Sequence, residues 1–244
     1  MSCPYGTGET MFVIPCKYNA TSNYIIDLVT QIREYHSDEK IMVVDSDSSD
    51  KSYFSQLESL NVIVEDVANT NWMIGAYWHG YKKFPDEDFY FFFHDSMKVK
   101  ANLDYLKEKN LFLLADFNRE AARSFNAWND KILQETKIDK RFIKSNGRGC
   151  YGPIFGCKNW VMKSLLEKGV DKLLPSNKRE TGFCEGAYGL FFESLGFNLS
   201  DCVLYGDILK LESPGGKSGP YPHDTSWEYP IEKFYASHQD QRRK

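Results

Sequence analysis

The segment DFYFFF, residues 88–93, most limits what this chain can fold into, because five apolar residues follow one another with no polar residue between them. Such a run is typical of a strand buried on both faces, as in a parallel sheet covered by helices. Further candidate strands precede it, at residues 11–15, 40–45 and 61–66. Stretches of helical periodicity lie between the strands, at residues 22–36, 52–60 and 71–84. This alternation predicts an α/β fold with a mostly parallel central sheet flanked by helices.

The second half of the chain is less regular. It holds a candidate strand at residues 110–117, a glycine-rich crossing segment at 145–156, and candidate helices at 158–169 and 183–196. Gly169 and Gly196 stand where these two helices should end. The glycine and proline density of residues 212–230 predicts a mobile loop. Because neither a repeat nor a linker interrupts the 244 residues, we expect a single domain.

Composition excludes several classes of protein. The net charge of −4, with both signs interspersed, argues against the strong basic field that holds nucleic acids. No apolar run reaches the roughly 18 residues that span a bilayer, and the first residues lack a signal-peptide pattern. The six cysteines are too scattered for a zinc cluster or a disulfide framework. We therefore expect a cytoplasmic protein with reduced thiols, no membrane span and no nucleic-acid partner.

Polar side chains follow three of the candidate strands, at the point where each strand ends. CKYN (16–19) follows the first strand, DSDSSD (45–50) the second, and HDS (94–96) the aromatic one. The carboxyl ends of parallel strands meet at one edge of a sheet, where α/β proteins bind ligands. There Asp45 can accept hydrogen bonds from a base or ribose, and Asp95 can ligate a divalent cation that neutralises a diphosphate. The alternative for both residues is a purely structural helix cap or Asx-turn.

Two common phosphate-binding signatures are missing. The segment after the first strand, PCKYNA, lacks the G-x-G-x-x-G of dinucleotide-binding proteins, and no G-x-x-x-x-G-K-[ST] occurs. The segment PGGKSG, residues 214–219, has a lysine and a serine but follows no candidate strand. Lys217 is therefore a candidate only for a phosphate-binding nest in a loop.

Two segments together resemble the opening of GT-A glycosyltransferases of the inverting family-2 type. That family has Pro-x-Tyr-Asn after its first strand and Val-Asp-Asp-x-Ser-x-Asp after its second. The segment FVIPCKYNATSNYIIDLVTQI matches the first pattern at Pro15, Tyr18 and Asn19. The segment KIMVVDSDSSDKS matches the second pattern at Val44, Asp45, Ser48 and Asp50. Compact chains of this kind also resemble glycosyltransferases of large viruses and phages, which would place this one in a host cytoplasm.

The resemblance implies a Rossmann-like GT-A fold with a smaller acceptor-side part and a C-terminal loop. A single domain over residues 1–244 would have a nucleotide-binding half at about 10–100, an acceptor-side half at about 101–210, and a lid and tail at 211–244. The segment NTNWMIGAYWHGY is similar to the family's next nucleotide-contacting segment. The implied nucleotide-binding residues, with the loop lysine added, are Pro15, Tyr18, Asn19, Asp45, Ser46, Ser48, Asn71, Gly75 and Lys217.

The chain departs from the family at the metal site. Where the family has Asp-x-Asp, this sequence has His94-Asp95-Ser96, with a single carboxylate. The resemblance implies a Mn²⁺ or Mg²⁺ ion held by Asp95, alone, with His94, or with a ligand from elsewhere. His223 is the candidate from elsewhere, because a histidine of a C-terminal loop completes the metal shell in some GT-A enzymes. A loop histidine without a ligand role is the alternative.

The segment FCEGAYGLFFESLGF resembles the region where the family carries an acidic pair followed by a helix. Glu185 matches the first acid, whereas Gly186 replaces the second. The resemblance implies that Glu185 is the general base that takes the proton of the acceptor hydroxyl. Glu180 is the alternative base, and an acid favoured near a helix start is the structural alternative for Glu185.

Together these features predict a metal-dependent glycosyltransferase that moves a sugar from a nucleoside-diphosphate sugar to a glycan or other hydroxyl acceptor. A uridine donor and inversion at the sugar carbon follow from the resemblance alone. An inactive nucleotide-sugar-binding protein is the non-enzymatic alternative, because the Asp-x-Asp and the acidic pair are incomplete. A sugar-phosphate nucleotidyltransferase is the other enzyme, disfavoured because YGTGET precedes the first strand and lacks an arginine.

Overall fold

The computed structural model describes residues 9–18, 24–119, 128–143, 147–207 and 230–233. Within these ranges the main sheet has six strands in the order β3-β2-β1-β4-β9-β6. Its strands are β1 (Thr10–Cys16), β2 (Lys40–Asp45), β3 (Ile63–Asp66), β4 (Phe89–Phe92), β6 (Leu111–Leu113) and β9 (Phe155–Lys158). The strands β1 to β4 run parallel, whereas β9 runs antiparallel to both of its neighbours. The predicted α/β fold with a mostly parallel sheet is therefore confirmed.

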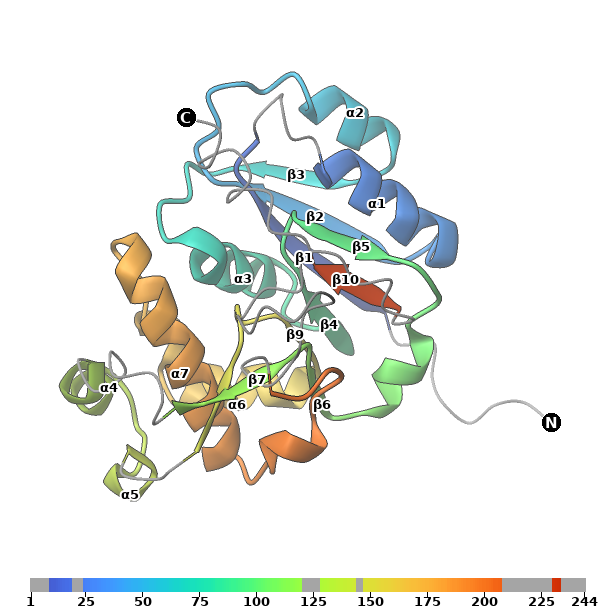
Figure 1. Cartoon of the computed structure of the whole chain (residues 1–244). Helices are drawn as coiled ribbons and strands as arrows, with labels where there is room; N and C mark the ends of the chain where they lie inside the picture. The colour runs from blue at the N-terminus through green and yellow to red at the C-terminus, as the bar shows by residue number, and fades with distance from the viewer. Residues whose placement is uncertain (1–8, 19–23, 120–127, 144–146, 208–229, 234–244) are drawn as a thin grey trace, which may run out of the picture.

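Helices cover both faces of this sheet (Figure 1). One face carries α1 (Tyr24–Tyr35) and α2 (Phe54–Ser59); the other carries α3 (Trp72–Lys83), α6 (Asn159–Glu167) and α7 (Lys178–Ser194). Successive side chains of a strand point to opposite faces, so each strand contributes to two cores. Phe12 and Ile14 of β1 pack on the α1 side, whereas Met11 and Val13 pack on the α3 side. Burial on both faces explains the unbroken apolar runs that predicted these strands.

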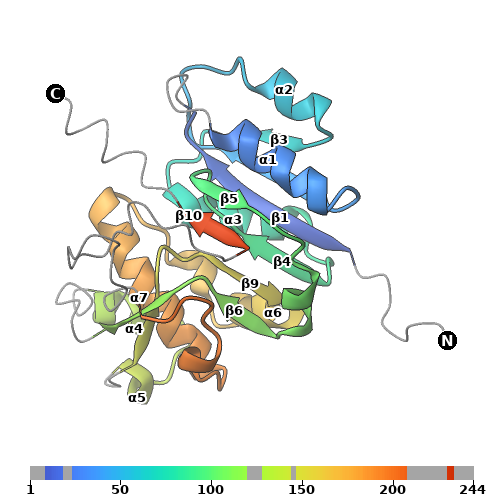
Figure 2. The same cartoon turned by 45° about the vertical axis from the view of Figure 1, so that its right-hand side comes forward.

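Two short sheets flank the main one. The strand β5 (Met97–Val99) pairs with β10 (Ile231–Lys233), and β7 (Asp116–Asn118) pairs with β8 (Arg148–Cys150). Figure 2 shows β10, from the far end of the described chain, lying beside β5, which follows β4 closely. The short helices α4 (Asn129–Glu135) and α5 (Lys140–Ile143) lie near α7. The pairing of β10 with β5 brings the last described residues, 231–233, beside the strand that follows β4.

Elements of the first hundred residues lie close to their predicted bounds. The strand predicted at 11–15 does not end at Pro15, because β1 continues to Cys16, which pairs with Asp45. Proline removes one N–H donor, but its carbonyl oxygen can still accept a hydrogen bond. The result is that β1 and β2 end level with each other, at the edge where the polar segments begin.

The second half of the chain differs more from the elements predicted for it. The strand predicted at 110–117 is two strands, β6 and β7, that belong to different sheets. The helix predicted from residue 183 is α7, and it begins five residues earlier, at Lys178, because the side chain of Asn177 caps it by accepting from the Glu180 N–H. Gly169 and Gly196 adopt φ angles of +79° and +92° and end their helices as predicted. Neither β5 nor β10 was predicted.

Three further expectations concern the chain as a whole. No helix among the described residues is long and apolar enough to cross a membrane. The described cysteines are free: Cys16, Cys150, Cys157, Cys184 and Cys202. The glycine- and proline-rich segment expected to be a mobile loop lies outside the described residues, apart from its last residue.

Close packing of α7 on β8 predicts that Gly189→Ala destabilises the protein by about 1–3 kcal/mol. A Cβ at Gly189 would lie 2.1 Å from the carbonyl oxygen of Arg148 and 2.7 Å from Cα of Gly149, so backbone would have to move. Gly182→Ala on the same helix is the matched control, because a Cβ there meets nothing within 4 Å. Since alanine favours a helix over glycine by up to about 1 kcal/mol, this control should stabilise the protein. Chemical denaturation measures both changes; equal effects would contradict the packing described for α7.

Candidate active site

A cavity of about 360 Å³ opens at the carboxyl ends of the parallel strands. Its lining comes from the segments that follow all four of these strands. The lining residues are Pro15 and Lys17 after β1, Ser46 and Asp47 after β2, Asn69, Thr70, Trp72 and Met73 after β3, and His94 and Asp95 after β4. The predicted meeting of the polar segments at one edge of the sheet is therefore confirmed. The segment after β3 joins them, although the sequence pattern did not single out Asn69 or Thr70.

Asp45 lies behind the cavity wall and not in it. Its side chain is fully buried, and its carboxylate accepts hydrogen bonds from the Tyr53 hydroxyl at 2.6 Å, the Ser48 N–H at 2.9 Å and the Lys51 ammonium at 2.5 Å. Burial acts to raise the pKa of Asp45, but the bonds from Lys51, Ser48 and Tyr53 outweigh it and hold this pKa below its ordinary value. The carboxylate thus fixes the turn that presents Ser46 to the cavity.

Tyr18 and Ser48 join the ends of β1 and β2. The N–H of Tyr18 donates to the Ser48 hydroxyl at 2.8 Å, and the Tyr18 ring stacks on Tyr53 with centroids 4.3 Å apart. Pro15 lies in the cavity wall beside this junction. Asn19, the fourth residue predicted from this part of the sequence, lies outside the described residues.

Asn69 holds the β3 side of the cavity against the β2 side. Its amide donates to the Ser46 hydroxyl at 3.1 Å and to the Trp72 carbonyl at 2.7 Å. The predicted residues Asn71 and Gly75 lie just outside the lining: Asn71 donates to the Pro175 carbonyl, and Gly75 leaves space for Asn69. A Cβ at Gly75 would lie 2.2 Å from the Asn69 side-chain oxygen. Gly75 thus permits the position of a residue that lines the cavity.

His94 and Asp95 form the floor of the cavity after β4. Burial raises the pKa of Asp95 to about 6, against the opposing effects of the Lys17 N–H and the charge of Lys233. Nδ1 of His94 lies 3.1 Å from Nζ of Lys233. Burial and the Lys233 charge together lower the pKa of His94 well below its ordinary value, so His94 is neutral. A neutral imidazole and a half-buried acid therefore lie near a lysine ammonium.

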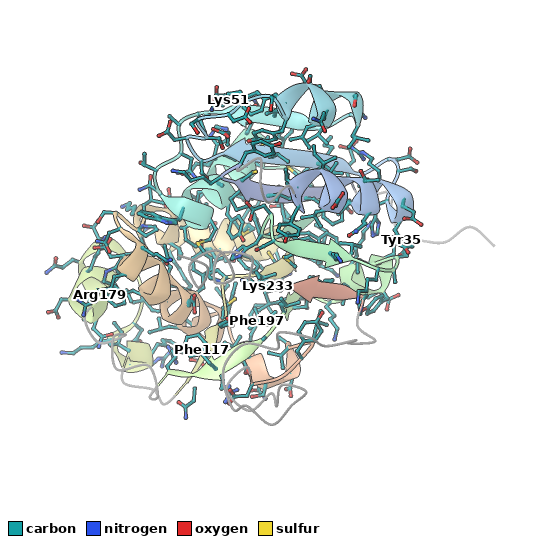
Figure 3. The ribbon with its side chains drawn as sticks, turned by 45° about the horizontal axis from the view of Figure 1, so that its top comes forward. Tyr35, Lys51, Phe117, Arg179, Phe197 and Lys233 are labelled. Carbon is teal, nitrogen blue, oxygen red and sulfur yellow. The ribbon has the colours of Figure 1, made fainter. Side chains whose placement is uncertain are left out.

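Glu185 reaches the same cluster from the middle of α7. Burial raises the pKa of Glu185 above its ordinary value, while the Lys233 charge and the Gly152 N–H act in the opposite direction. Burial lowers the pKa of Lys233, against the charges of Glu185 and Asp95. Lys233 thus stands between the acid of the cavity floor and the acid of α7. Figure 3 shows Lys233 toward the middle of the molecule, whereas Lys51, the partner of Asp45, lies at its upper edge.

Gly152 makes this arrangement possible. Its φ of +61° is in the left-handed region that favours glycine, and a Cβ there would lie 3.0 Å from Nζ of Lys233. The sequence marked this part of the chain as glycine-rich, and the resemblance placed it in the acceptor-side half. Lys233 had no local signal at all, because the short strand that carries it does not stand out in the sequence. Its role depends on the pairing of β10 with β5.

The donor set at Asp95 does not fit a divalent cation among the described residues. His36, Glu39 and Asp104 are the only described group in which three potential ligands approach one another closely. That group already holds the Lys107 ammonium between its two carboxylates. Asp95 offers one carboxylate, and the nearest imidazole nitrogen faces Lys233. The predicted ligand His223 and the predicted phosphate contact Lys217 lie outside the described residues.

Comparisons with known proteins give structural likeness only. No protein-family model matches the chain, and no curated protein matches it in sequence. Core-mannan synthase A from Aspergillus fumigatus, in its Mn/GDP form, aligns with a TM-score of 0.46 and 8% identity over 83% of this chain and 74% of that one. TarS 1–349 from S. aureus, in complex with UDP, aligns with a TM-score of 0.42 and 13% identity over 72% of this chain and 54% of that one.

GalNAc-T7 with UDP, GalNAc and Mn²⁺ aligns with a TM-score of 0.46 and 12% identity over 75% of this chain and 40% of that one. This chain therefore spans about three quarters of the first of these structures and about half or less of the other two. Likeness of this degree carries no argument about function, which has to come from the site itself.

The raised pKa of Asp95 predicts that Asp95→Asn stabilises the protein at high pH. The pKa of about 6 in the folded chain exceeds the ordinary value of about 3.9. The folded state therefore binds the proton more tightly, and its stability falls as pH rises from about 4 to about 6. Asparagine keeps the shape without the charge. The melting temperature of the variant should exceed that of the wild type by several degrees at pH 8, with the gap closing toward pH 4.

The control for this prediction is Asp86→Asn, at an acid whose side chain is 88% exposed. This change should leave the melting temperature nearly constant at both pH values, because an exposed carboxyl loses little solvation on folding. A stabilisation by Asp95→Asn that is the same at pH 4 and pH 8 would contradict the burial described for Asp95.

Proposed function

We propose that this protein is a glycosyltransferase that moves a sugar from a nucleoside-diphosphate sugar to a hydroxyl acceptor. The observation that carries this proposal is the cavity at the carboxyl ends of the parallel strands, together with Glu185, a half-buried acid of raised pKa that interacts with Lys233, the neighbour of the cavity residue His94. Such an edge is where α/β folds bind nucleotides, and a carboxyl whose pKa is raised toward neutrality suits proton transfer.

The cavity has the groups that a nucleotide needs. Ser46, Asp47 and Asn69 supply hydroxyl, carboxylate and amide oxygens or N–H groups for a base and a ribose, and Trp72 supplies an aromatic face. Asp47 and Trp72 adopt φ angles of +58° and +50°, in the left-handed region that non-glycine residues rarely occupy. Such backbone strain gathers at functional sites. Lys17 adds a positive charge suited to the diphosphate.

In the proposed reaction Glu185 acts as the base, a role supported by the sequence resemblance and by its raised pKa. The acceptor oxygen attacks the anomeric carbon, the bond from that carbon to the diphosphate oxygen breaks, and its electron pair leaves with the diphosphate. Glu185 takes the proton released by the acceptor hydroxyl. Base catalysis of this kind contributes about 10²–10⁴-fold. Attack from the side opposite the diphosphate would invert the sugar carbon, which here rests on the sequence resemblance.

The sequence resemblance implies a divalent cation at Asp95. The described residues offer Asp95 as a single carboxylate, and Mn²⁺ or Mg²⁺ bound through it would need further ligands from the diphosphate or from outside the described residues. No step of the mechanism proposed here passes through a metal ion. The uridine donor, the glycan acceptor and any viral origin likewise rest on the resemblance alone.

A second candidate is binding without turnover. The observation that favours it is the electrostatic interaction of Glu185 with Lys233, because two half-buried opposite charges can hold a fold together without reacting. In that case the protein would bind a nucleotide sugar and leave it intact.

Replacement of the proposed base predicts a large and selective loss of activity. Glu185→Gln keeps the size and an acceptor oxygen for the Gly152 N–H, but it cannot take a proton. Transfer or slow hydrolysis of a sugar donor, followed by release of nucleoside diphosphate, should fall about 10²–10⁴-fold. The Kd for the nucleoside diphosphate should change little, because the substituted group belongs to the acceptor side.

The matched control is Glu180→Gln, one helical turn and one residue earlier on α7. Glu180 accepts from the N–H and hydroxyl of Ser176 at 2.7 and 2.9 Å and caps the helix, so its loss should affect stability and not turnover. This also makes Glu180 a poor alternative base. Loss of turnover in Glu180→Gln with retention in Glu185→Gln would reverse the assignment. Binding of nucleoside diphosphates with no turnover of a broad donor panel in the wild type would favour the binding protein.

A further inference from the structure

Lys233 places a positive charge against the inner side of the cavity floor. Its Nζ lies 3.1 Å from Nδ1 of His94 and 5.5 Å from the centre of the Tyr151 ring. The backbone makes room for it at Gly152, where a Cβ would lie 3.0 Å from Nζ and 3.5 Å from Cε1 of His94. The approach of Lys233 to His94 is therefore built into the chain by a glycine in a left-handed conformation.

This contact decides which nitrogen of His94 carries the hydrogen. A lysine ammonium has three donors and no acceptor, so Nδ1 has to offer its lone pair and Nε2 carries the N–H. The backbone of Gly152 also interacts with the ring and raises the pKa of His94, but Nε2 is buried and makes no hydrogen bond of acceptable geometry within the described part of the chain. Because His94 also lines the cavity, its N–H donor is suited to an acceptor oxygen bound there.

The same tautomer removes His94 as a metal ligand. A divalent cation binds a lone pair of an imidazole nitrogen, but here one nitrogen faces an ammonium and the other carries hydrogen. Asp95 alone does not form a group of three ligands with any other described side chains. The charge of Lys233 nevertheless acts on Asp95, and Lys17 brings a second lysine to the cavity lining.

We propose that His94 and Lys17 bind the diphosphate of the nucleotide directly, with Lys233 holding His94 as a donor, so that this site needs no divalent cation. The inference rests on the function proposed above. Nε2–H of His94 and the ammonium of Lys17 donate to phosphate oxygens, as charge-assisted donors commonly do. Lys233 is a positioning residue, which fixes the tautomer of His94 and adds its charge to the potential at the floor of the cavity.

Calorimetric titration with UDP, GDP and the matching nucleosides tests this, in EDTA and in Mn²⁺. The wild type should bind one diphosphate in EDTA with a Kd within about 3-fold of that in Mn²⁺. Lys233→Met should weaken binding of that diphosphate by about 10–100-fold, or about 1.4–2.8 kcal/mol. Binding of the nucleoside should weaken by less than about 2-fold. Lys163→Met, at a lysine of α6 whose side chain is 55% exposed, is the matched control and should change neither.

A pair of His94 variants gives an independent readout that needs no change at Lys233. Glutamine places an amide N–H near the position of Nε2, whereas phenylalanine keeps the ring shape without a donor. His94→Gln should retain diphosphate binding within a few-fold, and His94→Phe should lose it to the extent of Lys233→Met. If thermal unfolding shows that Lys233→Met does not fold, this pair decides the question.

The outcomes separate the two proposals. Diphosphate binding that requires Mn²⁺ and vanishes in EDTA overturns the inference and leaves the proposed function standing. If folded Lys233→Met loses affinity for diphosphate and nucleoside to the same extent, Lys233 has a general structural role and the inference is overturned. Equal diphosphate binding by His94→Gln and His94→Phe also overturns the inference. Failure of any nucleoside diphosphate to bind the wild type, with or without Mn²⁺, overturns the proposed function itself.

Discussion

The level ending of the parallel strands is the constraint on which the site depends. Cys16 of β1 pairs with Asp45 of β2, and Asp45 pairs with Asp66 of β3, so these chains leave the sheet side by side. Register is fixed because the strands are buried on both faces, and a shift by one residue would exchange their two sets of core side chains. The thiol of Cys16 lies near both acids that this register brings to one edge. Burial raises the pKa of this thiol, and the charges of Asp95 and Asp45 raise it further.

The two acids at this edge have opposite environments, which suggests opposite uses. Asp45 accepts three hydrogen bonds and keeps its charge, so it is suited to holding the Ser46 turn in place. Burial raises the pKa values of Asp95 and Glu185, and the charge of Lys233 lowers both. Their charge states therefore respond to what binds nearby. Buried groups of this kind cost stability. The fold keeps Asp95 in the lining of the cavity and Glu185 in the middle of α7.

The sequence predicted the nucleotide-side half of the site better than the rest. Alternating strand and helix patterns identified β1 to β4, and general topology then brought their polar ends together, including Asp95. Within that edge the side-chain roles were harder to predict, because Asp45 turned out to lie behind the wall that Ser46 and Asn69 form. Hydrogen bonds within the turn decide which of these side chains faces the cavity, and a single sequence does not specify those bonds.

What the sequence determined by itself is the parallel half of the sheet and the edge where a ligand would bind, because hydrophobic period and strand order depend on local residue choice. Only the tertiary structure decided which charged group lies beside His94 and Asp95. Lys233 comes 138 residues after Asp95 in the chain, and it reaches His94 because β10 pairs with β5 and Gly152 leaves space for its ammonium. Contacts so distant in the chain leave no periodic trace in the sequence, since each depends on how separate elements pack.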